Sequence, residues 1–95
     1  MIIWDETKNL KLQKERHISF EKISDIILNK AYRDILENPS RPNQQIFVIE
    51  LDNYIYAVPF IIDEHSNIIL KTAYPSRNLN KKYGGEKDEP KPGQI

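Results

Sequence analysis

The sequence predicts an α+β fold, in which helices pack on one face of a small antiparallel β-sheet of three to four strands. Residues 45–51 and 54–62 are β-branched and aromatic runs on either side of Asp52-Asn53, a two-residue turn that suits a hairpin. Residues 18–27 instead repeat isoleucine and phenylalanine at the spacing of a helix. A chain of 95 residues is long enough for one domain.

Two helices are expected before the sheet and a short one after it. Residues 5–16 contain mostly helix formers, with Asp5 as a candidate N-cap and acids preceding bases. The next helix should begin after Ser19 and end near residues 29–30, because one apolar stripe runs along it. The last helix should begin after Ser76. The stripe of the second helix consists of Phe20, Ile23, Ile26 and Ile27.

The remaining strands carry weaker signals. Residues 2–4 form either a short strand or a buried lead-in, and residues 32–36 either pair as a strand or join the loop after them. Residues 68–74 should form a strand. Pro59 cannot donate a ladder hydrogen bond, so we expect it at a bulge or on an edge strand. The predicted core consists of Ile23, Ile27, Phe47, Ile49, Ile55 and Val58.

Composition excludes several classes of protein. The chain has no cysteine, no apolar run near the roughly 20 residues of a membrane helix, and no secretory leader. We therefore expect a cytoplasmic protein, with no membrane partner. His17 and His65 lack metal-ligand spacing, and the three glycines all follow residue 83, so no metal site and no cofactor are expected. Residues 1–83 should form the domain, and residues 84–95 a flexible polar tail.

Uncompensated positive charge is concentrated near the C-terminus of a chain with zero net charge. Residues 71–83, "KTAYPSRNLNKKY", contain no acid. Ser76 and the amides after it would start a helix, where a phosphate can bind, and Tyr74 and Tyr83 can stack on bases or transfer protons. The alternative is a solvated helix whose cations favour its dipole. The cations of this segment are Lys71, Arg77, Lys81 and Lys82.

A second basic group precedes the predicted Phe20 helix. Lys8, Lys11 and Lys14 recur every three residues and lead to Arg16 and His17 in a turn. These residues can form the other wall of a phosphate-binding surface, or the lysines can simply line the solvent side of a helix.

An ordered set of motifs resembles BrnT-family toxins of type II toxin–antitoxin systems. These motifs are "WDETKN" (residues 4–9), "ISFE" (residues 18–21) and "YPSRNLNKKY" (residues 74–83), with the hairpins between them. The resemblance covers nearly all of residues 2–83. It differs at residues 15–17, where Glu-Arg-His replaces the Lys-His-Gly of many members, and in the neutral charge of this chain.

The resemblance implies a RelE-like fold and metal-independent cleavage of RNA, in which the 2′-hydroxyl attacks the adjacent phosphate. It also implies a partner antitoxin, often with a ribbon-helix-helix DNA-binding domain. Arg77 would clamp the phosphate, because a guanidinium offers two parallel donors. Arg16 or Lys82 would supply a second cation. The candidates for proton transfer are His17, Tyr74 and Tyr83, and the further phosphate-binding candidates are Lys11, Lys71, Ser76 and Lys81.

Two other functions are compatible with the sequence. The domain can be a catalytically inactive RelE-like module that engages an antitoxin or nucleic acid without turnover. It can also be a regulatory partner whose basic segment docks an acidic peptide.

Overall fold

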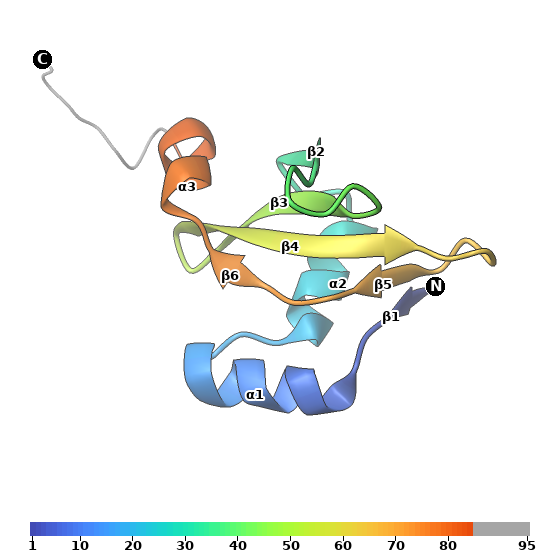
Figure 1. Cartoon of the computed structure of the whole chain (residues 1–95). Coiled ribbons are helices and arrows are strands. Elements are labelled where there is room, and N and C mark those ends of the chain that lie inside the picture. The colour runs from blue at the N-terminus through green and yellow to red at the C-terminus, as the bar shows by residue number, and fades with distance from the viewer. Residues whose placement is uncertain (85–95) are drawn as a thin grey trace, which may run out of the picture.

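A computed structural model describes residues 1–84 and shows an α+β fold (Figure 1). The predicted tail begins at Gly84, which caps the last helix, and the rest of that tail lies outside the described residues. None of the helices within residues 1–84 is long and apolar enough to cross a membrane. The elements are β1 (Ile2–Ile3), α1 (Glu6–Arg16), α2 (Phe20–Leu28), β2 (Asp34–Glu37), β3 (Gln45–Leu51), β4 (Tyr54–Ile62), β5 (Ile68–Leu70), β6 (Tyr74–Pro75) and α3 (Arg77–Tyr83).

The sheet corrects the prediction of a purely antiparallel arrangement of three to four strands. In the described residues it has six strands in the order β1-β5-β4-β3-β2, with β6 also paired to β4. The pairs of β2, β3 and β4 are antiparallel, as expected, but β1 runs parallel to β5 and opposes Ile2 to Ile68. The mixed character was missed because a two-residue strand leaves no alternation to detect in the sequence.

Pro59 lies in a central strand, opposite an interruption of the neighbouring ladder. Leu70 opposes Phe60, and Tyr74 opposes Ala57, so the three residues between β5 and β6 face two residues of β4. The extra residue makes a bulge-like bend between β5 and β6. The Pro59 carbonyl accepts a 2.9 Å hydrogen bond from the Lys71 amide on this side. The missing N–H of Pro59 therefore faces the bend, where the ladder is already broken.

The two faces of the sheet are covered by different helices. Phe47, Ile49, Val58 and Phe60 share a core cluster with buried side chains of α1 and α2. Ile55 is also fully buried but lies on the opposite face, where α3 packs against β4. The side-chain amide oxygen of Asn80 in α3 accepts a 3.1 Å hydrogen bond from the Ile55 amide. All six predicted core residues are buried.

Side chains begin each helix where the sequence predicts. Asp5 Oδ1 accepts from the Thr7 amide at 2.8 Å. Ser19 Oγ and Ser76 Oγ each accept at 3.2 Å from an amide three residues later. These caps satisfy amides that lack a partner within the helix, so the helix starts are set locally.

A fully buried asparagine joins α1 to α2. Asn9 Oδ1 accepts a 2.8 Å hydrogen bond from the Phe20 amide, and its amide nitrogen donates to Glu21 Oε1 at 2.8 Å. His17 ends α1 in the left-handed conformation, with φ 59°, and turns the chain into α2. The side chain of Asn9 therefore holds the two helices in one arrangement.

Candidate functional site

Two adjoining hollows lie beside the β5–β6 bend. One, of about 410 Å³, lies between the loop of residues 38–44, Pro59 and β6. The other, of about 300 Å³, lies between α1 and the bend. Lys8, Lys71 and Thr72 line both hollows, so the two adjoin. We call the pair the basic groove.

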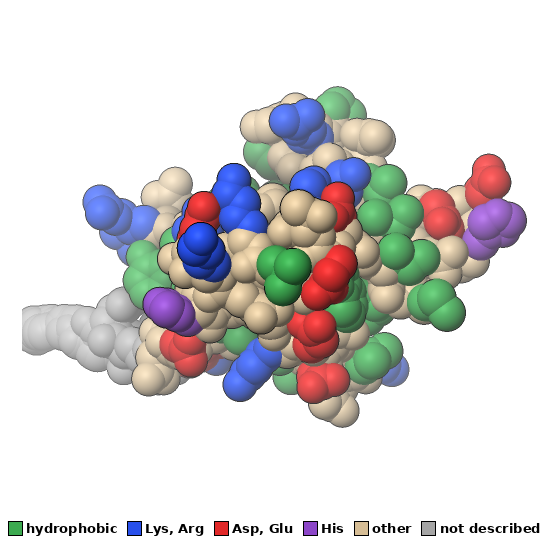
Figure 2. Space-filling view, turned by 90° about the horizontal axis from the view of Figure 1, so that it is seen from below, with side chains coloured by type: hydrophobic (Ala, Val, Ile, Leu, Met, Phe, Trp, Pro, Cys, Tyr) green, Lys and Arg blue, Asp and Glu red, His purple; other side chains and the backbone are tan. Residues whose placement is uncertain are grey.

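Positive side chains from three separate segments line the basic groove. Within residues 1–84 none of them forms an ion pair with a carboxylate, and Glu15 is the one acid among the lining residues. Figure 2, which views the molecule from the α1 side, shows Lys and Arg side chains gathered across its upper left and upper centre. The groove therefore carries a net positive charge on a neutral chain. Its cations are Lys8, Lys11, Arg16, Arg41 and Lys71.

Helix periodicity places the α1 wall of the groove. Lys8, Lys11 and Glu15 follow one another at intervals of three and four residues, and Arg16 is eight residues after Lys8, so the four lie toward one side of the helix. Leu12 lies among them and packs into the core, which fixes the rotation of α1. Lys8 Nζ also donates to the Lys71 carbonyl oxygen at 3.3 Å. This contact holds α1 against the bend.

The loop of residues 38–44 supplies the opposite wall. The Asn38 amide donates to the Gln44 carbonyl oxygen at 3.2 Å, and the Gln44 amide donates to the Arg41 carbonyl oxygen at 2.9 Å. These bonds close the loop and leave the Arg41 side chain exposed. Sequence reasoning missed Arg41, because a single arginine between turn residues carries no pattern.

The structure gathers four of the predicted site residues in the basic groove: Lys11, Arg16, Lys71 and Tyr74. His17 lies elsewhere, in a hollow of about 370 Å³ lined also by Lys22 and Asp52. Arg16 and His17 are neighbours in sequence, but the left-handed turn at His17 sends them to different hollows. The structure therefore does not combine their side chains at one site.

The remaining candidates belong to α3 and its cap. Ser76 Oγ is engaged with the Leu79 amide, while Arg77, Lys81 and Lys82 are exposed. None of these residues is among the described residues that line the basic groove. The segment of residues 71–83 is thus divided: Lys71, Thr72 and Tyr74 line the groove, whereas α3 packs against β4.

The side chain of Tyr83 is hydrogen-bonded to Asp34, which suits a structural role in anchoring α3 to β2. Its hydroxyl donates a 2.6 Å hydrogen bond to Asp34 Oδ2, which raises the pKa of the phenol. The same bond, with the Ile35 amide and the charge of Lys82, lowers the pKa of the Asp34 carboxyl. Arg33 Nη1 donates to the Tyr83 carbonyl oxygen at 2.9 Å, and Arg33 also pairs with Glu50. A phenol whose pKa is raised is a poor general base near neutral pH.

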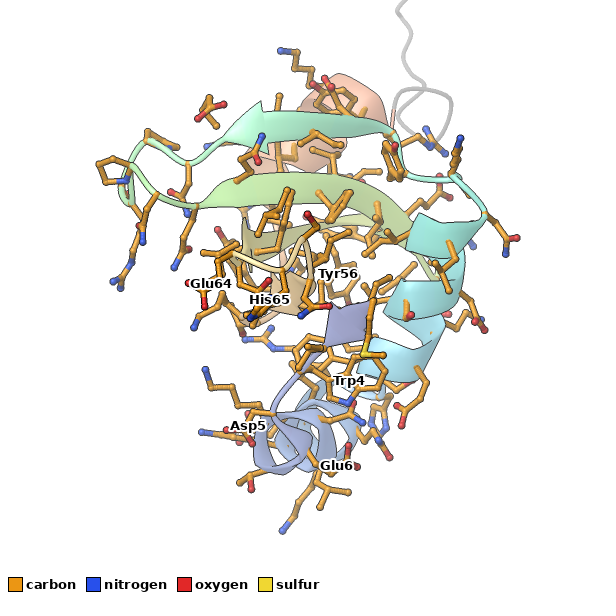
Figure 3. The ribbon with its side chains drawn as sticks, turned by 90° about the vertical axis from the view of Figure 1, so that its right-hand side faces the viewer. Trp4, Asp5, Glu6, Tyr56, Glu64 and His65 are labelled. Atoms are coloured by element: carbon orange, nitrogen blue, oxygen red, sulfur yellow. The ribbon has the colours of Figure 1, made fainter. Side chains whose placement is uncertain are left out.

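His65 lies on the exposed turn between β4 and β5. Figure 3 shows Glu64 and His65 there, apart from Asp5 and Glu6 at the start of α1. His65 Nε2 is 3.5 Å from Glu64 Oε2. Residues 1–84 contain no group of three or more histidine, aspartate or glutamate side chains that could hold a metal ion.

Comparisons of the chain with protein-family models, curated proteins and solved structures returned no match.

Proposed function

We propose that this chain is a BrnT-like toxin that binds RNA phosphates in the basic groove. One observation carries the proposal: five cations from α1, the loop of residues 38–44 and the bend line one groove without forming ion pairs within residues 1–84. When such cations bind phosphates, they release the counterions condensed on the nucleic-acid backbone, and this release favours binding. Basic side chains that only face solvent need not line two adjoining hollows.

Cleavage of the bound strand is the second part of the proposal. The RNA 2′-hydroxyl attacks phosphorus, the bond to the 5′-oxygen breaks, and a 2′,3′-cyclic phosphate and a free 5′-hydroxyl result. In this proposal Arg16 and Lys71, which both line the smaller hollow, stabilise charge on the phosphate. Glu15 and Tyr74 are the groove residues able to accept the 2′-hydroxyl proton and to protonate the leaving oxygen, help worth about 10²–10⁴-fold.

The order of elements supports a RelE-like fold. Two helices precede the antiparallel strands and a short helix follows, which is the order that the BrnT resemblance implies. We propose that an antitoxin, with a ribbon-helix-helix domain as is common in the family, neutralises the toxin by covering the groove with an acidic segment. Co-expression with the adjacent open reading frame, followed by size exclusion, tests this partnership. A chain that elutes alone argues against it.

A binding module without turnover is the alternative that one observation favours. His17 lies outside the basic groove, and the Tyr83 hydroxyl is engaged with Asp34. The groove therefore contains few groups for proton transfer but many for binding phosphate.

The deciding experiment uses RNA in EDTA. Parent protein should bind the RNA and produce fragments with 2′,3′-cyclic phosphate ends. The double variant Lys11→Ala/Arg16→Ala should lose both binding and cleavage, whereas Lys14→Ala, on α1 but outside the groove lining, should retain them. Binding without fragments supports the inactive module. No RNA binding by parent protein refutes the proposal.

A further inference from the structure

The two hollows of the basic groove differ in chemistry. The smaller one is lined mainly by charged side chains of α1 and by the bend. The larger one adds amide, hydroxyl and aromatic groups, which come from Asn38, Ser40, Gln44 and Tyr74. We infer that the larger hollow is a nucleobase subsite for single-stranded RNA, next to a phosphate site at the smaller one. This inference rests on the proposed function.

Strand geometry places the walls of the larger hollow on one face of the sheet. Tyr74 opposes Ala57, and residues directly opposite in an antiparallel pair point to the same face. Pro59, two residues along β4, shares this face and lines the hollow. Gln44 continues β3 two residues before Ile46, which opposes Pro59. The hollow thus has Pro59 between an aromatic ring and a carboxamide.

The carboxamide side retains hydrogen-bonding groups. Asn38 Oδ1 accepts from the Ser40 amide at 3.0 Å, and Asn38 Nδ2 donates to Gln44 Oε1 at 3.4 Å. The Gln44 side-chain nitrogen has no partner among the described residues, and neither does the hydroxyl of Thr72. Asn38 orients the Gln44 amide, so its N–H groups are positioned to donate to the edge of a base.

Tyr74 provides the aromatic surface. Its side chain is 40% exposed and lines the hollow, so its ring is accessible to a ligand. A base can stack on such a ring, while Arg41 and Lys71 reach the phosphates on either side of it. This arrangement requires an unpaired base, because a base in a duplex is already stacked and its pairing edge is occupied. A volume of about 410 Å³ falls in the range of small-ligand sites.

The test compares an RNA hexamer with an abasic hexamer that keeps every phosphate. Fluorescence anisotropy of labelled strands on the whole chain gives both affinities at one salt concentration. We expect the abasic strand to bind about 10-fold more weakly, the order of loss for a missing stacked base. A hexamer paired to its complement should also bind more weakly than the single strand.

Variants assign the effect to the hollow. Tyr74→Leu and Gln44→Ala should each reduce the difference between the two hexamers, and Tyr74→Phe should preserve it because the ring remains. Lys11→Ala should weaken both hexamers alike and leave their ratio unchanged, since it removes only phosphate attraction. Circular dichroism of each variant checks that it is folded.

The outcomes separate this inference from the proposed function. If parent protein binds neither hexamer, both are refuted. If it binds the two hexamers equally, the base subsite is refuted and the phosphate-binding groove stands. If Tyr74→Leu weakens both hexamers by the same factor, Tyr74 does not stack on a base, and the inference fails in the same way.

Discussion

The hydroxyl of Tyr83 donates a 2.6 Å hydrogen bond to Asp34 Oδ2 and so ties α3 to β2. These residues lie on the helix that ends the described chain and on the strand at the edge of the sheet. The bond lowers the pKa of Asp34 from its ordinary value of 3.8 and raises that of Tyr83 from 10.0. It is strongest when the carboxyl is charged and the phenol is neutral.

Tyr83→Phe should lower the melting temperature at neutral pH. In the parent chain, the depressed pKa of Asp34 gives stability above about pH 4 that is lost as pH falls through the folded-state value. The raised pKa of Tyr83 gives stability below about pH 10 that is lost as pH rises through its folded-state value. Thermal melts across pH should therefore show the two proteins converging at both extremes.

Tyr54→Phe is the matched control. Its hydroxyl has no hydrogen-bond partner among the described residues, and its ring packs edge-on against Tyr56. Tyr54→Phe should therefore show the same dependence of melting temperature on pH as the parent. Equal melting curves for Tyr83→Phe and the parent would show that the bond contributes nothing in solution.

Asn9→Ala should lower the free energy of unfolding by about 1–3 kcal/mol, the cost of leaving a buried donor unpaired. The Phe20 amide would lose its acceptor, and the link between α1 and α2 would be broken. Urea denaturation measures the change. Asn78→Ala, at an exposed position of α3, should stay within about 0.5 kcal/mol of the parent. Similar values for both variants would contradict the role given to Asn9.

Ile49→Ala should cost about 2–5 kcal/mol, because it leaves a cavity in the core under the N-terminal helices. Ile62→Ala, at a side chain that is 57% exposed, removes the same atoms with little effect. The same urea assay measures both. Equal destabilisation by the two variants would contradict the assignment of Ile49 to the core.

Lys71→Ala should weaken RNA binding and reduce the slope of log affinity against log salt by about 0.7, the value for one lost phosphate contact on a single strand. Titrations at several salt concentrations give the slope. Lys30→Ala, an exposed lysine outside the groove lining, should leave it unchanged. An unchanged slope for Lys71→Ala would show that Lys71 does not contact an RNA phosphate.

Arg77→Ala tests the clamp that the BrnT resemblance implies. Arg77 is exposed on α3 and outside the groove lining, so its loss should leave the fold intact. If Arg77 stabilises the reacting phosphate, cleavage should fall by about 10²-fold, and Arg77→Lys should restore only part of it. Fragment yields from single-turnover reactions decide this. Unchanged cleavage would leave the chemistry to Arg16 and Lys71.

Most of the fold was predictable because its signals are local. Asp5, Ser19 and Ser76 cap the expected helices, and Asp52-Asn53 turns between β3 and β4, both residues with positive φ. Residues 2–4 were left open between a strand and a lead-in, and residues 68–74 were expected as one strand, whereas the structure has β5 and β6 with a bend between them. The pairing of β1 and β6 was not predictable, since each has two residues and depends on a distant strand. The parallel pairing of β1 with β5 is what makes the sheet mixed.

The site was predictable only in part. Charge without counter-charge indicated Lys71 and the end of α1, and the fold brings these together. Arg41 comes to the groove through the closure of its loop, which composition does not reveal. The cations of α3 were expected beside Lys71 because they follow it in sequence. Instead, the bend and the pairing of β6 with β4 direct the chain away from the groove, and α3 packs against β4.

The parallel pairing of Ile2 with Ile68 also determines when the sheet can finish folding during synthesis. A chain leaving the ribosome exposes β1 and α1 before β5, because the strand partner of β1 follows only after the central hairpin. Contacts between such distant segments form after local ones, because a long loop must close first. The basic groove has α1 on one side and the β5–β6 bend on the other. A nascent chain therefore lacks the assembled groove until residues 71–74 have left the ribosome.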